Sequence, residues 1–108
     1  GAPLETFVVT ELLKMSEWSQ MPLLKLYYFQ NHDNREVDVV LERADGKIVG
    51  IEVKAAASAA AADFKGLHAL AEATGDRFIR GLVLYLGPTQ VQFAPNLWAV
   101  PLSRLWGN

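Results

Sequence analysis

The 108-residue sequence contains no cysteine, which excludes disulfides, thiolate metal sites and cysteine nucleophiles. It contains no apolar run long enough to span a membrane, and its first residues lack the charged-then-apolar form of a signal peptide. These absences agree with a reducing compartment. We therefore expect a cytoplasmic protein with no membrane partner.

A strong net charge is also missing. The formal net charge is −2 and the pI is about 5.6, so bulk charge does not attract the chain to phosphate backbones. A nucleic-acid site would need a local basic patch. The candidate cations are scattered in the sequence, a pattern that is typical of an ordinary solvated surface. They are Lys14, Lys25, Lys54, Lys65, Arg77 and Arg80.

What the sequence does have is enough apolar residues, 51% of the total, to build a core in a chain of ordinary domain length. We expect residues 1–108 to form a single domain, because no linker or repeat interrupts them. The chain starts almost directly in a helical pattern. We therefore expect it to be a fragment of a longer protein.

The first half of the sequence predicts one helix and two strands. Apolar residues at three-and-four spacing indicate a helix over Leu4–Met15, followed by a loop over Ser16–Pro22. A strand over Leu24–Phe29, a polar turn at Asn31–Asn34 and a strand over Glu36–Glu42 follow. Strict alternation in the last strand puts Val37, Val39 and Leu41 on one face, with Glu36, Asp38, Val40 and Glu42 on the other.

The second half predicts a hairpin and then a crossover. Asp-Gly within Ala44–Lys47 is a strong turn signal, and Ile48–Ala55 follows as a strand antiparallel to its predecessor. An Ala-rich segment, 55–62, leads into a helix with Asp63 as a cap or first-turn acid. Phe64, Leu67, Leu70 and Ala71 form its apolar face. The remaining elements are a strand at Phe78–Leu86 that is buried on both faces, short strands at Val91–Phe93 and Leu97–Val100, and a closing segment, Leu102–Trp106.

The strand–helix–strand crossover between Ile48 and Leu86 implies a parallel pair, whereas the preceding hairpins are antiparallel. The expected fold class is therefore α/β, with a mixed β-sheet flanked by helices.

Acidic and basic side chains share one face of the central strands. Glu52 and Lys54 are two residues apart, so they project side by side at roughly 6.6–6.8 Å. Asp38 lies across the hairpin, within reach of a shared metal ion. A fourth candidate is Glu11, three residues after Val8 on the apolar stripe of the first predicted helix, where an unpaired charge is costly.

Carboxylates of this kind select Mg²⁺ or Mn²⁺, and an adjacent lysine can stabilise charge that develops during phosphodiester hydrolysis. Each feature has an ordinary reading when taken alone. A Glu-x-Lys triplet on a strand often forms only a surface ion pair, and a solvent-facing Asp is common. The hairpin connection together with Glu11 favours the site.

These residues resemble the signature of the PD-(D/E)XK phosphodiesterase superfamily, which has the restriction-endonuclease-like fold. The sequence is most similar to a C-terminal domain of unknown function found in prokaryotic AAA+ ATPases. The similar segments are Glu5–Lys14, Glu36–Glu42, Ile51–Lys54, Asp63–Leu67 and Leu97–Trp106. The resemblance implies a domain at the C-terminus of a longer AAA+ ATPase and a Mg²⁺-dependent or Mn²⁺-dependent nuclease acting on DNA.

The resemblance also implies residue roles. Asp38, Glu52 and the Val53 main-chain carbonyl become metal ligands, Lys54 becomes the catalytic lysine, and Glu11 becomes an auxiliary acid. Two features depart from the superfamily pattern. Val37 replaces the proline of the motif, and no Gln or Tyr follows the Ala-rich segment to contact a further phosphate, although Lys65 is a possible substitute.

Other residues are weaker candidates. Two isolated histidines, His32 and His68, lack paired acids, and Ser58 and Ser103 lack the context of a catalytic triad. Aromatic residues could stack on bases, but packing is the more ordinary role for Tyr27, Tyr28, Phe29 and Trp98.

Two functions therefore remain open. The first is a metal-dependent nuclease, and the alternative is a catalytically silent module that binds nucleic acid or protein and regulates an attached ATPase. The sequence leaves the oligomeric state open.

Overall fold

The computed structural model describes residues 23–105. The predicted helix Leu4–Met15 with Glu11, the loop Ser16–Pro22 and Trp106 lie outside the described residues. The elements in chain order are β1 (Leu23–Gln30), β2 (Glu36–Arg43), β3 (Ile48–Val53), η2 (Ala61–Phe64), α2 (Lys65–Thr74), η3 (Gly75–Arg77), β4 (Phe78–Tyr85), β5 (Val91–Ala94), β6 (Leu97–Pro101) and η4 (Leu102–Leu105).

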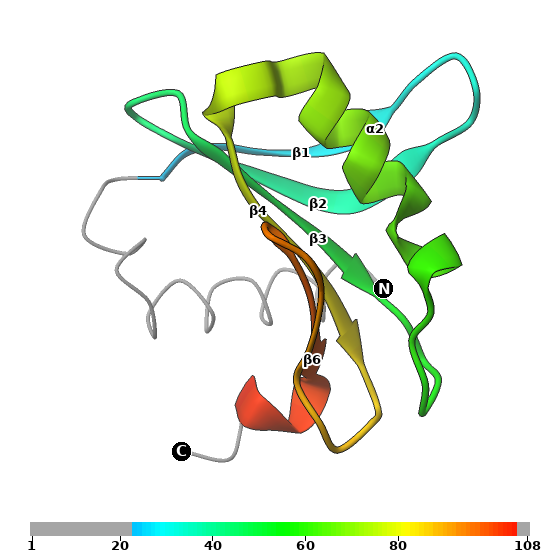
Figure 1. Ribbon diagram of the computed structural model, residues 1–108. Helices are drawn as coiled ribbons and strands as arrows, with labels where there is room; N and C mark the ends of the chain where they lie inside the picture. Colours follow the sequence, from blue (N-terminus) through cyan, green and yellow to red (C-terminus); the bar gives the residue numbers. More distant parts are fainter. Residues whose placement is uncertain (1–22, 106–108) are drawn as a thin grey trace.

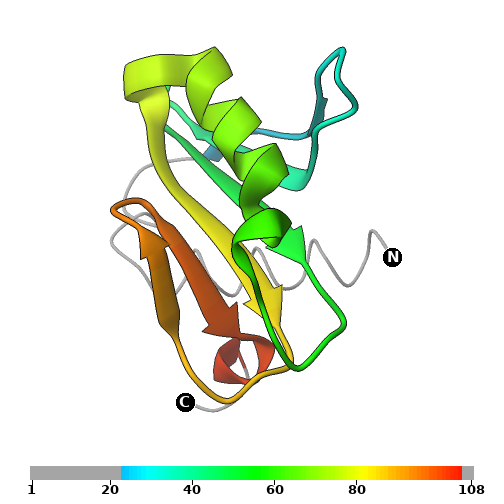
Figure 2. The same cartoon turned by 45° about the vertical axis from the view of Figure 1, so that its right-hand side comes forward.

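The strands form one mixed six-stranded sheet in the order β1-β2-β3-β4-β6-β5. The β1–β2 and β2–β3 pairs are antiparallel, whereas β3–β4 and β4–β6 are parallel. Helix α2 provides the crossover between β3 and β4 and lies across one face of the sheet (Figures 1 and 2). The predicted α/β class, the parallel pair and the mixed sheet are confirmed.

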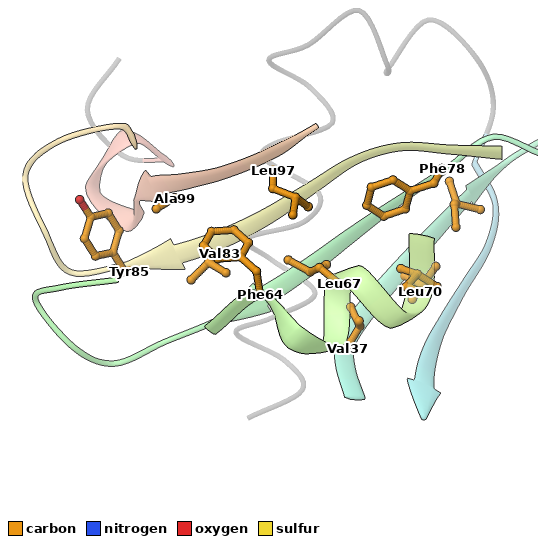
Figure 3. Packing of buried hydrophobic residues seen from close by; sticks show 11 residues of the cluster. Val37, Phe64, Leu67, Leu70, Phe78, Val83, Tyr85, Leu97 and Ala99 are labelled. Carbon is orange, nitrogen blue, oxygen red and sulfur yellow. The ribbon is translucent and has the colours of Figure 1, made fainter. Parts of the chain in front are cut away.

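The helix-side core is built by the predicted apolar face of α2. Phe64, Leu67 and Leu70 are buried against strand residues that include Val83 and Leu97 (Figure 3). A second cluster of buried side chains on the sheet consists of Val39, Leu41, Val49, Ile51 and Leu84. Strand β4 contributes to both clusters, as its continuous apolar sequence predicts.

The Asp-Gly hairpin between β2 and β3 forms as predicted. Gly46 has a φ of 88°, a left-handed conformation that favours glycine, and its N–H donates to the Arg43 carbonyl at 3.0 Å. The hairpin pairs Glu42 with Ile48 and continues to Val39 opposite Ile51. This register brings Asp38 and Glu52 to the far ends of the two strands.

The prediction of strict alternation along β2 is wrong at Val37. Tyr27 pairs with Val40 and Phe29 pairs with Val37, so β2 contains one residue more than β1 in this interval. Such a β-bulge shifts the side-chain alternation. Val37 therefore packs with Val40 in the helix-side core, not with Val39.

One boundary differs from the prediction, and the order of the last two strands was not predicted. Strand β3 ends at Val53 instead of Ala55, although the Lys54 N–H still donates to the Leu84 carbonyl at 2.8 Å. Strand β6 pairs with β4 and places β5 at the sheet edge, an order that short strands do not reveal in a sequence. Within residues 23–105, α2 is the only α-helix.

No helix within residues 23–105 has the length and apolar character needed to cross a membrane.

Candidate metal and phosphate site

Asp38 and Glu52 interlock the ends of β2 and β3 where the regular pairing stops. The Asp38 N–H donates to Glu52 Oε1 at 2.7 Å, and the Val53 N–H donates to Asp38 Oδ2 at 3.0 Å. The two carboxyl groups thus accept hydrogen bonds from main-chain N–H groups, which in regular strand pairing would donate to carbonyls of the opposite strand. We call Asp38 and Glu52 the acid pair; the two hydrogen bonds hold its carboxyl groups at the ends of β2 and β3.

The environment of the acid pair disfavours two negative charges. Burial of Glu52 is the largest effect and raises the pKa of its carboxyl group to about 8, above its ordinary value of 4.5. The Asp38 N–H lowers this pKa, while the neighbouring charges of Asp38 and Glu36 raise it further. A cation between the two carboxyl groups would relieve this electrostatic cost.

The Lys54 ammonium does not supply that cation. Its Nζ donates to Asp63 Oδ2 at 2.6 Å, and the same oxygen accepts the Ala60 N–H at 2.7 Å. The hydrogen bond from Lys54 is the main reason why the pKa of Asp63 is lowered. Asp63 is a first-turn acid of η2, one of the two roles predicted, and it accepts the N–H of the N-cap residue Ala60. Its ion pair with Lys54 was not predicted. Only the fold brings the Ala-rich loop back to the strand.

The acid pair lies in an open, polar cleft of about 350 Å³. The cleft is formed by the start of β2, the end of β3 and the first turn of α2, and its lining residues are Asn34, Arg35, Glu36, Asp38, Glu52, Ala62, Asp63, Lys65 and Gly66. Gly66 permits this arrangement, because a Cβ there would lie 1.8 Å from the Glu36 carbonyl oxygen.

The donor set suits a hard cation such as Mg²⁺. Mg²⁺ keeps several waters and binds through one or two carboxylates, which Asp38 and Glu52 can supply together with the Val53 carbonyl. Within residues 23–105, no group of three or more His, Cys, Asp or Glu side chains could hold a metal ion. A third acidic ligand would therefore have to come from elsewhere, and Glu11 lies outside the described residues.

None of the weaker candidates lines the cleft. His32 is exposed in the β1–β2 turn, 3.5 Å from Asp33, and His68 is exposed on α2. Ser58 and Ser103 are also exposed.

The aromatic candidates divide into two groups. Tyr27 and Phe29 pack against the helix-side core, while Trp98 is half-buried. Tyr28 is 52% exposed, and its hydroxyl donates to Glu36 Oε1 at 2.6 Å beside the cleft. The hydrogen bond to Glu36 is the main reason why the pKa of Tyr28 rises to about 12.

Comparison with known proteins gives a family for this chain. None of the curated proteins matches it significantly. A family described as a domain of unknown function, DUF4143, matches residues 1–105 and so covers nearly the whole sequence. The chain belongs to the DUF4143 family of domains of unknown function.

Proposed function

We propose that this domain is a divalent-metal-dependent nuclease that hydrolyses phosphodiester bonds in DNA. The proposal assigns it to the restriction-endonuclease-like fold and to the C-terminus of a cytoplasmic AAA+ ATPase. The main support is the interlocked acid pair, because two half-buried carboxyl groups are held side by side and neither forms an ion pair within residues 23–105. Such a pair costs stability unless it binds a cation.

Mg²⁺ or Mn²⁺ would polarise the phosphate and lower the pKa of a bound water. Asp38 and Glu52 would hold this ion, with the Val53 carbonyl as a further ligand. Glu52 must lose its proton before it binds, so protons and metal ions compete at this carboxyl group. Glu11 would be the auxiliary acid.

Lys54 would stabilise negative charge on the phosphate during hydrolysis. Its ammonium group is held by Asp63, which itself lines the cleft. A bound phosphate can attract Lys54 only by competing with this ion pair. The predicted catalytic role of Lys54 therefore requires that its Nζ move from Asp63 Oδ2 towards the substrate.

The test combines calorimetric Mn²⁺ titration with cleavage of single-stranded, duplex and branched DNA and of RNA. Asp38→Asn and Glu52→Gln retain an oxygen that can accept the main-chain N–H but remove a charge. Both should abolish metal binding and cleavage, and Lys54→Ala should abolish cleavage only. Asp45→Asn is the matched control, because Asp45 lies at the opposite end of the same strands. Metal binding by Asp38→Asn that equals the wild type would refute the site.

The Lys54–Asp63 ion pair also favours a second candidate, a catalytically silent module that regulates an attached ATPase or binds a partner. A lysine held in this way stabilises the loop after β3 without any chemistry. In that case Asp38→Asn would leave the function of the full-length protein unchanged, and no nucleic acid would be cleaved.

A further inference from the structure

Two basic residues from distant parts of the sequence line the cleft that contains the acid pair. Arg35 comes from the turn before β2, and Lys65 is the first residue of α2. They line the same cleft because Gly66 allows the first turn of α2 to pack directly on the backbone of Glu36. A local basic pair, which the scattered cations of the sequence did not reveal, is thus created by the fold.

Asn31 holds the main chain of Arg35 in place. Asn31 Oδ1 accepts the Arg35 N–H at 3.0 Å, and the Asn31 N–H donates to the Arg35 carbonyl at 3.0 Å. The guanidinium group takes no part in these contacts. The turn therefore positions Arg35 at the cleft without using its guanidinium group.

Neither Arg35 nor Lys65 forms an ion pair with an acid in the part of the chain that the structure describes. The ion pairs there are His32–Asp33, Arg43–Asp45, Lys54–Asp63 and Arg77–Glu42. The acids nearest in the cleft are already engaged. Glu36 accepts the Tyr28 hydroxyl, and Asp63 accepts Lys54.

We propose that Arg35 and Lys65 bind the phosphates that flank the scissile bond, so that the substrate is a nucleic-acid strand held by its backbone. This inference rests on the proposed nuclease function. A phosphodiester strand carries repeated negative charges, which can engage both cations while one phosphate lies at the acid pair. Because phosphate contacts carry no base information, binding should show no sequence preference.

The cleft also contains the acidic side chains of Glu36 and Asp38, whose negative charge repels a phosphate strand before a cation enters. A divalent ion at the acid pair reverses this balance. Strand binding through Arg35 and Lys65 should therefore require the metal, although neither residue is a metal ligand.

The test measures fluorescence anisotropy of a short labelled single-stranded DNA with the full chain. Ca²⁺ replaces Mg²⁺, and salt is varied. The variant is Arg35→Gln with Lys65→Gln, and the control is Arg80→Gln, an exposed arginine outside the cleft. The double variant should bind about tenfold more weakly, and its salt dependence should fall by about one counterion or slightly more. Either single substitution should give part of this loss if the double variant fails to fold.

Binding by the double variant that equals the wild type, or an equal loss in Arg80→Gln, would overturn the inference. So would a wild type that fails to bind the strand in Ca²⁺. Displacement of the DNA by polyglutamate more readily than by unlabelled DNA would indicate an acidic protein partner instead, which also overturns it. Strand binding that depends on Arg35 and Lys65, without cleavage in Mg²⁺, would support the phosphate site and contradict only the proposed nuclease function.

Discussion

The two ends of the β2–β3 pair carry carboxyl groups in opposite electrostatic situations. At the hairpin end, Asp45 accepts Arg43 Nη2 at 2.6 Å and the Lys47 N–H at 3.1 Å, and the hydrogen bond from Arg43 is the main reason why its pKa is lowered. At the cleft end, Glu52 faces Asp38, and burial raises its pKa. One end supplies its own cation, whereas within residues 23–105 neither acid at the other end forms an ion pair.

This difference separates a structural acid from a candidate functional acid on the same two strands. Arg43 and Asp45 are two residues apart in the sequence and form an ion pair with each other. Lys54 is also two residues from Glu52, but it pairs with Asp63 on the loop after β3. The spacing of charged residues is therefore alike at both ends, and the tertiary contact decides which acid is neutralised.

The largest expected effect is stabilisation by metal. Mn²⁺ at a hundred times its dissociation constant should raise the free energy of unfolding by about 2.7 kcal/mol, because only the folded chain assembles the acid pair. Thermal melting with and without Mn²⁺ measures this gain. Asp38→Asn should lose it and Asp45→Asn should retain it. An equal gain in both variants would show that the two ends do not differ.

The second-largest effect on stability should follow a substitution at Gly66, which lines the cleft. Gly66→Ala places a Cβ against the Glu36 backbone and should lower the free energy of unfolding by about 1–3 kcal/mol. Denaturant unfolding measures the loss, and His68→Ala, an exposed change on the same helix, is the control. Wild-type stability in Gly66→Ala would mean that α2 can move away from β2 without cost.

The pH dependence of stability should give a smaller effect. Below pH 4.5, Glu52 is protonated in both folded and unfolded chains and costs nothing. Between that pH and about 8, Glu52 is ionised in the unfolded chain while burial keeps it protonated in the folded chain. The free energy of unfolding therefore falls as the pH rises through this range. After allowance for solvent screening we expect a loss of about 1–2 kcal/mol without metal.

Glu52→Gln should remove this loss, which denaturant unfolding at pH 5 and pH 8 will show. The variant would then be more stable than the wild type at pH 8 while unable to bind metal. Wild-type and variant curves that stay parallel across this range would contradict the raised pKa.

The smallest effect should follow Asp45→Asn. The Asp45 carboxylate is exposed to solvent, so its pair with Arg43 is screened and contributes little. Its lowered pKa means that the contribution is present above its ordinary value of 3.8 and is lost as the pH falls below it. Melting at pH 7 should therefore change less than in Glu52→Gln. A larger change in melting temperature for Asp45→Asn than for Glu52→Gln would contradict this order.

The sequence alone determined the features that depend on neighbours along the chain. The Asp-Gly hairpin, the apolar face of α2 and the continuous apolar sequence of β4 each follow from residue type and spacing. The hairpin register also explains why Asp38 and Glu52 could be expected near each other. Their roles in metal binding remain a proposal.

Only the tertiary structure decided the features that depend on contacts between distant segments. The bulge that places Val37 in the helix-side core, the pairing of Lys54 with Asp63 and the entry of Arg35 and Lys65 into one cleft are of this kind. The physical reason is that the first turn of α2 packs on the start of β2 and so brings Lys65 and Arg35 to the same cleft. A sequence shows which charges exist, but the fold determines which of them are neutralised.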